Sequence, residues 1–230
     1  MPVTNAVLLI AVVAFVAGHF LLSHTWRKPL IAKLGQSGFT GLYTAVAVVL
    51  LGLVGVVYHF APHGPALWDS DNAVLQLAFG GISYVATVLF LGSLGNNPTL
   101  VGATLSGLST RLPNGTFLIT RHPMMFAIAA LSAAVILLIP STRDLIGGTG
   151  MIVLALVGAR LQDKKKLAQS HREYNPWVKR TRFWPDLRQA GALGLYWIIG
   201  VPVWLLMTWV LMRATFMPCG VWYFFPSLNG

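Results

Sequence analysis

The sequence predicts an all-α protein: a polytopic membrane helix bundle with about six transmembrane helices and both termini on the non-cytoplasmic side. Hydrophobic residues make up 56% of the 230-residue chain, charged residues only 10%, and the mean hydropathy is +0.70. Such a composition excludes an ordinary soluble globule. The apolar residues also form continuous runs, and a helix of roughly 20 of them crosses a hydrocarbon core about 30 Å thick.

Six runs approach that length. They cover, in order, about residues 3–22, 39–60, 72–94, 124–139, 145–161 and 190–212. The fourth and fifth are the shortest, and the fourth ends at Pro140. The first run has no basic start and is followed, rather than preceded, by positive charge. We therefore interpret it as a retained helix and not as a cleaved signal peptide.

The basic residues orient the bundle. All of the 16 Lys and Arg residues except Arg143 and Arg213 lie in three segments that alternate with nearly uncharged ones. Cytoplasmic loops of membrane proteins carry such an excess. We therefore place the three segments on the cytoplasmic side of the membrane, against anionic lipid headgroups. The same distribution argues against a nucleic-acid partner, despite the net charge of +10 and the pI near 10.3.

The chain is expected to form a single integral membrane domain over residues 1–230. Its one cysteine, Cys219, excludes an internal disulfide and a multi-cysteine metal site. We expect the polar stretch 162–189 to extend the fifth helix into the cytoplasm, with Asn175-Pro176 ending or kinking it. The loop 95–120 contains apolar residues that need burial, so a re-entrant or interfacial piece is expected there. An aromatic tail follows the last helix from Phe216.

Histidines are the main candidates for chemistry. His19 lies within the first run, in the cytoplasmic third of the bilayer, and an ionisable group at this depth indicates a functional site. Arg121 and His122 precede Pro123 where the fourth helix begins, at a similar depth. His59 lies at the other end of the second helix, roughly 30 Å from its cytoplasmic start. The alternatives are a neutral histidine bonded to a neighbouring helix, and an ordinary helix cap beside a snorkelling arginine.

Several short motifs follow one another in order between about residues 15 and 187. They are His19 with Ser23 and Arg27, Leu34-Gly35, Gly41-Leu42-Tyr43, Tyr58-His59, Leu67-Trp68, Asn97-Pro98-Thr99-Leu100, Thr120-Arg121-His122-Pro123-Met124 and Asp163-Lys164-Lys165-Lys166. In these motifs the chain resembles the NnrU family of bacterial membrane proteins, which is related to 15-cis-zeta-carotene isomerase. The helix at 190–212 and the aromatic tail lie beyond the region of resemblance.

The resemblance implies haem b bound through histidines, because the isomerase uses haem b to isomerise a cis double bond of a polyene. His19 and His59 match two of its histidines, but only His19 and His122 have compatible depth as iron ligands. Arg121 and His59 are further cofactor-binding candidates. This chain also departs from the isomerase pattern in the fourth helix. Leu131 and Val135 stand where the family has Trp and His, and Ser132 where the isomerase has Cys.

Other functions stay open beside an isomerase-like enzyme acting on an apolar, lipid-soluble substrate. The family name implies a factor of nitrogen-oxide metabolism. The chain could instead be a non-catalytic accessory subunit of a larger membrane complex. The Arg-His-Pro tripeptide also occurs in isoprenylcysteine carboxyl methyltransferases, and Asp163, Tyr174 and Arg182-Phe183-Trp184-Pro185 resemble the layout found there. In that alternative, Arg121 and His122 hold the carboxylate of S-adenosylmethionine and Asp163 engages its amine.

Overall fold

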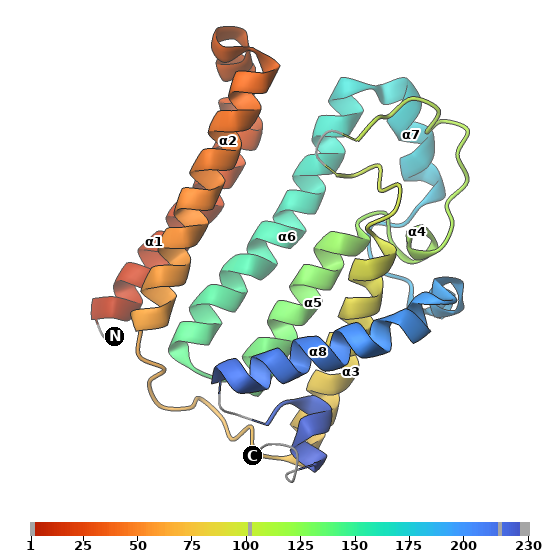
Figure 1. Cartoon of the computed structure of the whole chain (residues 1–230). Helices are drawn as coiled ribbons and strands as arrows, with labels where there is room; N and C mark the ends of the chain where they lie inside the picture. Colours follow the sequence, from red (N-terminus) through yellow and green to blue (C-terminus); the bar gives the residue numbers. More distant parts are fainter. Residues whose placement is uncertain (1–2, 101–102, 216–217, 226–230) are drawn as a thin grey trace.

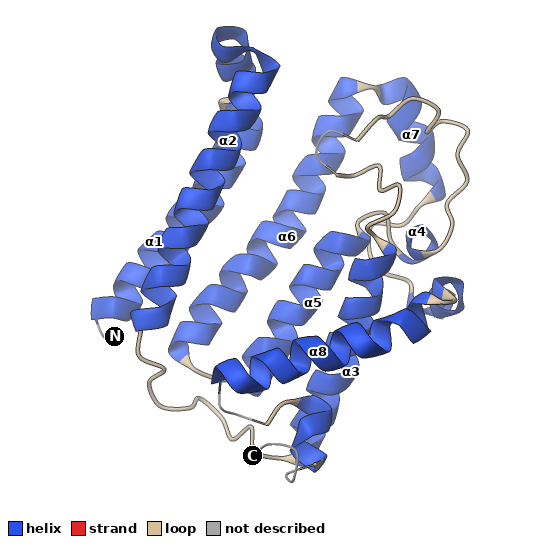
Figure 2. Cartoon of the chain, viewed as in Figure 1, coloured by secondary structure: helices blue, strands red, loops and turns tan. Residues whose placement is uncertain are grey.

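The computed structural model describes residues 3–100, 103–215 and 218–225, and all regular structure within these ranges is helical (Figure 2). The elements are α1 (Val3–Phe20), the π-helical turn η1 (Leu21–Thr25), α2 (Arg27–Phe60), α3 (Ala73–Gly92), the single turn α4 (Thr116–Ile119), α5 (Pro123–Leu138), α6 (Thr142–Gln169), α7 (His171–Arg180), the 3₁₀ segment η2 (Leu187–Leu193), α8 (Tyr196–Thr215) and the 3₁₀ segment η3 (Gly220–Phe224).

Five helices are long and apolar enough to cross a membrane: α1 with η1, α2, α3, α6 and α8. The sixth predicted run corresponds in position to α8, and the fourth to α5, which is apolar but has only 16 residues. The prediction of an all-α polytopic bundle is thus confirmed. α8 lies obliquely across α3 (Figure 1), where the indole nitrogen of Trp204 donates a 2.9 Å hydrogen bond to the hydroxyl of Ser83.

The α1–α2 hairpin stands beside the rest of the bundle (Figure 1). Its corner consists of η1 and the first turns of α2, which begin at Arg27, well before the apolar run that starts near Phe39. Gly35 interrupts α2 with φ 70° and ψ 173°, a conformation that only glycine adopts without a steric penalty. Basic side chains at this corner can be hydrated outside the hydrocarbon core. The helix therefore extends beyond the apolar part of α2.

Helix α6 is the centre of the bundle, and three of its glycines admit neighbouring helices. A Cβ at Gly150 would come within 2.2 Å of Val12 on α1, and a Cβ at Gly148 within 2.7 Å of Ile136 on α5. A Cβ at Gly147 would stand 3.5 Å from the Tyr58 ring on α2. Small residues of this kind allow close helix packing within a membrane. They fix α1, α2 and α5 around the first half of α6.

A folded cap covers one end of the bundle. The connection between α3 and α5 contains α4 and packs on α7, where Leu108, Phe117, Tyr174 and Trp177 form a buried cluster. The cap buries apolar residues of this loop, as the sequence predicted. α6 ends at Gln169, and Pro176 lies inside α7. Of the expectation that Asn175-Pro176 would end or kink the extended helix, the ending was wrong, because the break falls earlier, at Ser170, and the buried ring of Trp177 holds α7 in place.

The two ends of the bundle differ in charge. α1 begins, α8 ends and η3 lies at the end opposite the cap (Figure 1). The basic segments lie at the end that carries the hairpin corner, α7 and the cap. The basic residues are thus gathered at one end of the bundle, as the sequence predicted. That this end faces the cytoplasm stays a prediction. Phe216, the start of the predicted aromatic tail, lies outside the described residues, and part of the tail forms η3.

Candidate functional site

The Arg121-His122 pair lies where an extended segment enters α5. Thr120 is extended, with φ −156°, and Pro123 occupies the start of the helix, where its missing N–H costs no hydrogen bond. The segment pairs with the chain that follows α7. The backbone N–H of Arg121 donates to the carbonyl of Arg182 at 2.8 Å, and the hydroxyl of Thr120 donates to the carbonyl of Phe183 at 2.6 Å. The two motifs singled out in the sequence therefore lie against each other.

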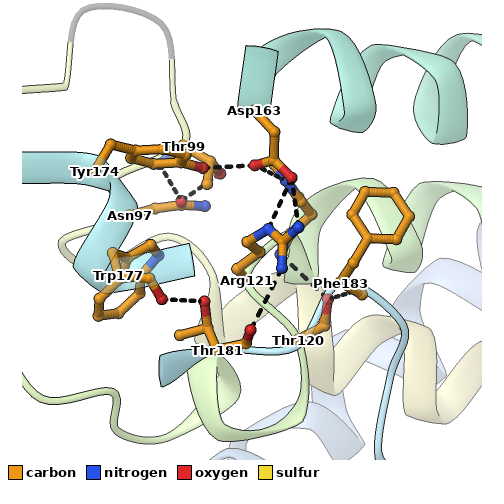
Figure 3. A network of polar contacts seen from close by, with 10 residues as sticks. Asn97, Thr99, Thr120, Arg121, Asp163, Tyr174, Trp177, Thr181 and Phe183 are labelled. Atoms are coloured by element: carbon orange, nitrogen blue, oxygen red, sulfur yellow. Dashed lines mark hydrogen bonds and ion pairs between the residues drawn. The ribbon is translucent and has the colours of Figure 1, made fainter. Parts of the chain in front are cut away.

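Asp163 of α6 is the centre of this cluster (Figure 3). Nε and Nη2 of Arg121 both lie 2.7 Å from its Oδ2. Its Oδ1 accepts hydrogen bonds of 2.7 Å from Nε2 of His122 and of 2.7 Å from the hydroxyl of Tyr174. A carboxylate with this many donors is held strongly in its ionised form. The cluster thereby joins α5, α6 and α7.

Burial closes the cluster to solvent. The side chains of Arg121 and Asp163 are each 12% exposed and that of His122 is 0% exposed. Burial, and then the neighbouring Asp163 carboxylate, raise the pKa of Tyr174, so its phenol stays a hydrogen-bond donor. Nε2 of His122 donates to Asp163, which leaves Nδ1 as the second ring nitrogen. That Nδ1 is buried and has no hydrogen-bond partner among the described residues.

This geometry does not fit the cofactor roles expected for the pair. His122 has no exposed surface, and its Nε2 is occupied by Asp163. Arg121 and Asp163 neutralise each other, so neither is free to hold the carboxylate or the amine of S-adenosylmethionine. In the described conformation the cluster is closed to ligands and holds α5, α6 and α7 together.

His19 lies at the other candidate position and is half-buried on α1. The hydroxyl of Tyr43, on α2, lies 2.7 Å from its Nε2. Both side chains line a cavity of about 90 Å³ between the hairpin corner and α6, which Gly158 and Gln162 also line. The interpretation of His19 as a neutral histidine bonded to a neighbouring helix matches this contact.

The structure does not bring the predicted iron ligands together. His19 faces the cavity beside Gln162, whereas His122 binds the next residue of α6, Asp163. The two histidines thus share a level along α6, as expected. Successive helical residues point about 100° apart, however, so the two rings face different sides of this helix. The cavity at His19 is also far smaller than the roughly 300–1,000 Å³ typical of a ligand pocket, so a haem macrocycle does not fit it.

His59 is exposed at the opposite end of α2 and packs edge-on against Phe60. A polar cluster near it was missed by sequence reasoning. The buried carboxylate of Asp144 accepts hydrogen bonds from Tyr58 and Ser141, and the guanidinium of Arg143 lies over the Tyr58 ring at 4.4 Å. The available signal was the Ser-x-x-Asp spacing of a helix cap, confirmed here by the bond from the Asp144 N–H to the Ser141 hydroxyl. Among the described residues, no group of three potential metal ligands gathers.

Two larger cavities lie along α1. One, of about 490 Å³, separates α1 from α6 and is lined by apolar side chains from Leu9 to Phe20 and from Leu145 to Val153. The other, of about 460 Å³, lies among α1, α2, α5 and α6. Leu131, Ser132 and Val135 line it, the positions at which the chain departs from the isomerase pattern. At its far end are Tyr58 and Asp144.

Comparison with known proteins yields one family. Residues 7–217 match the family model described as NnrU protein. The match extends beyond residues 15–187 on both sides and covers α8. No curated protein matches the chain, and no solved structure does.

Proposed function

Because this chain belongs to the NnrU family and carries five helices able to cross a membrane, we propose that it binds an apolar, membrane-dissolved molecule between the α1–α2 hairpin and α6. The observation that carries the proposal is the pair of apolar cavities on the two sides of α1. The first follows α1 for eleven residue steps, or roughly 16 Å at about 1.5 Å per residue. That length suits an extended hydrocarbon chain.

A polyene is the substrate class to test first. It is apolar and elongated, which matches the cavities, and it is the class implied by the resemblance to zeta-carotene isomerase. His19 and Tyr43 line the small polar cavity, which shares Phe20 with the first apolar cavity, and they supply an imidazole and a phenol next to it. Cis–trans isomerisation is the reaction that this assignment proposes. The proposed location is the bacterial inner membrane.

The test is retention of the ligand through purification. Protein from a polyene-producing host is purified in detergent, and its bound molecules are extracted and identified by chromatography and mass spectrometry. Val13→Trp fills the first cavity, and Val48→Trp places the same side chain on the outside of α2. Both valines are exposed, at 56% and 63%, but only Val13 lines the cavity. We expect Val13→Trp to lower the bound amount several-fold and Val48→Trp to leave it unchanged.

Equal retention by both variants, or no polyene above the level of the detergent extract, would overturn the proposal. Haem b stays a prediction separate from it. Protein from a haem-supplemented culture is examined by visible absorption, and a Soret band lost in His19→Ala would support haem binding. A protein without a Soret band would count against it.

A second candidate function is that of an accessory subunit in a larger membrane complex. The observation that favours it is the exposure of α2, whose most apolar 18-residue window contains no buried residue. Gly52 and Gly55 on this helix have open space where a Cβ would stand, which a partner helix could occupy at close range. Chemical cross-linking in native membranes followed by mass spectrometry tests this function. Cross-links from α2 to one reproducible protein would support it, and their absence would count against it.

A further inference from the structure

The small cavity at the hairpin corner holds an unusual set of charges. Arg27 at the start of α2 and Lys165 near the end of α6 both line it, together with His24. Its other polar walls are His19, the hydroxyls of Ser23, Thr40 and Tyr43, and the amides of Gln36 and Gln162, and no acidic side chain lines it. Arg27 and Lys165 line the same small cavity, so their positive charges repel each other. Two cations that converge without a counter-charge are costly at a partly buried position.

No carboxylate of the chain is available to balance them. The sequence has six acidic residues. In the structure each of them either has another partner or lies elsewhere in the chain. Asp163 is bound by Arg121 and His122, Asp144 by Tyr58 and Ser141, Glu173 by Ser109 and Asp186 by Arg188, while Asp69 and Asp71 lie in the connection between α2 and α3. The neutralising charge must therefore come from outside the chain.

Two polar atoms in the cavity walls also lack partners. Nε of Arg27 and Oε1 of Gln162 are buried and make no hydrogen bond to the described residues. The guanidinium of Arg27 is held over the ring of Phe39, 5.4 Å from its centroid, and that ring is buried. The cation is thus fixed in position while its donor remains unused. Buried polar groups normally have a partner. The unused donor of Arg27 requires an acceptor, such as an anion supplies, whereas Oε1 of Gln162 is itself an acceptor and is not evidence for an anion.

We propose that this cavity binds a phosphate group between the guanidinium of Arg27 and the ammonium of Lys165. A phosphate carries up to two negative charges for the two cations, and arginine binds its oxygens with directed, charge-assisted hydrogen bonds. The cavity volume of about 90 Å³ exceeds the roughly 10–15 Å³ that one water molecule needs and leaves room for a small polyatomic ion. A tetrahedral oxyanion is an ion of this kind. Its source is either an anionic phospholipid headgroup or a free phosphate ion.

Bound phosphate would join the hairpin corner to α6 and hold the cleft between them. The proposal does not depend on a ligand in the apolar cavities, because its cationic residues, Arg27 and Lys165, line neither of them. Binding is measured in two arms on the detergent-purified chain. Inorganic phosphate is titrated by calorimetry and by thermal unfolding, against chloride at matched ionic strength. Phosphatidylglycerol and phosphatidylcholine are compared by native mass spectrometry.

The variant Arg27→Gln/Lys165→Gln removes both cations at nearly constant size. Its matched control is Lys28→Gln/Lys164→Gln, which removes the same charge at the two exposed neighbouring positions that do not line the cavity. We expect the first variant to lose the phosphate-induced rise in Tm and to weaken binding at least tenfold. The control should bind like the wild type. Lys165→Arg keeps the charge and should retain binding, which separates loss of the site from loss of the fold.

Binding of phosphatidylglycerol alone would identify a lipid headgroup as the source, and binding of inorganic phosphate alone would identify the free ion. Two results would overturn the proposal. One is an equal loss in the control variant, which would indicate nonspecific attraction to the basic end. The other is no binding in either arm.

Discussion

Nε2 of His122 lies 2.7 Å from Oδ1 of Asp163, across the interface between the start of α5 and the second half of α6. Arg121 and Tyr174 bind the same carboxylate. The four side chains come from three helices, so the Arg-His-Pro motif acts in the described conformation as a lock between α5, α6 and α7. Chemistry is better supported on the other side of α6, where His19, Tyr43 and the apolar cavities lie.

Removing the charge of Asp163 should weaken the contacts among α5, α6 and α7. Asp163→Asn leaves the guanidinium of Arg121 buried without its counter-charge, and breaking such a buried pair costs about 3–5 kcal/mol. We expect a marked fall in the Tm of the detergent-purified protein, measured by tryptophan fluorescence. Asp186→Asn is the control, since Asp186 pairs with Arg182 and Arg188, whose side chains are 60% and 83% exposed. A loss of stability as large in the control as in Asp163→Asn would contradict the lock.

Close packing of α1 on α6 should depend on Gly150. A methyl group there would meet Val12 at 2.2 Å, and overpacking of this kind costs about 1–3 kcal/mol. Gly150→Ala is therefore expected to lower the Tm. It should also reduce cross-linking between cysteines introduced into α1 and α6.

Gly52→Ala is the matched control, because a Cβ at Gly52 meets nothing within 4 Å. Alanine is the better helix former, so this variant should change stability little or raise it by at most about 1 kcal/mol. A stable Gly150→Ala protein with normal cross-linking would show that α1 packs on α6 less closely than described.

Tyr174 should make the protein sensitive to alkali. Burial and the nearby Asp163 carboxylate raise the pKa of Tyr174 above its ordinary value of 10.0. A group whose pKa is raised on folding contributes stability that is complete below its unfolded pKa and is lost as the pH rises through the folded pKa. Tyr174→Phe removes one hydrogen bond to a charged acceptor, worth about 1.5–3 kcal/mol at neutral pH.

The measurement is the Tm of wild type and Tyr174→Phe between pH 7 and 11. The wild type should lose stability above pH 10 more steeply than the variant, so that the two curves converge. Tyr196→Phe, at the start of α8, provides a control for general effects of alkali. Parallel curves for wild type and Tyr174→Phe would argue against the raised pKa.

The sequence predicts the helices well because lipid burial depends on local composition alone. Their ends are less predictable. α2 begins at Arg27 rather than near Phe39, since a helix can continue with basic residues outside the hydrocarbon. The break between α6 and α7 depends on the packing of Trp177 in the cap, which is a tertiary contact.

The same distinction holds for the candidate site: its sequence motif could be predicted, whereas its tertiary contacts could not. The Arg121-His122 pair is visible in the sequence because it precedes Pro123 at the start of a helix. In the methyltransferase alternative its partner Asp163 engages the amine of S-adenosylmethionine, whereas in the structure Arg121 and His122 bind that carboxylate. The pairing of His19 with Tyr43 depends on how two helices are rotated against each other. Composition carries no information about that rotation.

The cap should loosen in acid through Glu173. The carboxylate of Glu173 accepts hydrogen bonds from the backbone N–H and the hydroxyl of Ser109, at 3.1 and 2.9 Å. These bonds lower the pKa of Glu173, because they favour its charged form. A group whose pKa is lowered on folding contributes stability that is present above its unfolded pKa and is lost as the pH falls through the folded pKa.

We therefore expect the wild type to lose stability below about pH 4.5, near the ordinary pKa of glutamate, and Glu173→Gln to lose less over the same interval. A double-mutant cycle with Ser109→Ala assigns the effect to this contact, since residues that share one interaction are not additive. At pH 7 the double variant should be little less stable than either single variant. Additive losses would show that Glu173 and Ser109 stabilise the cap independently of each other.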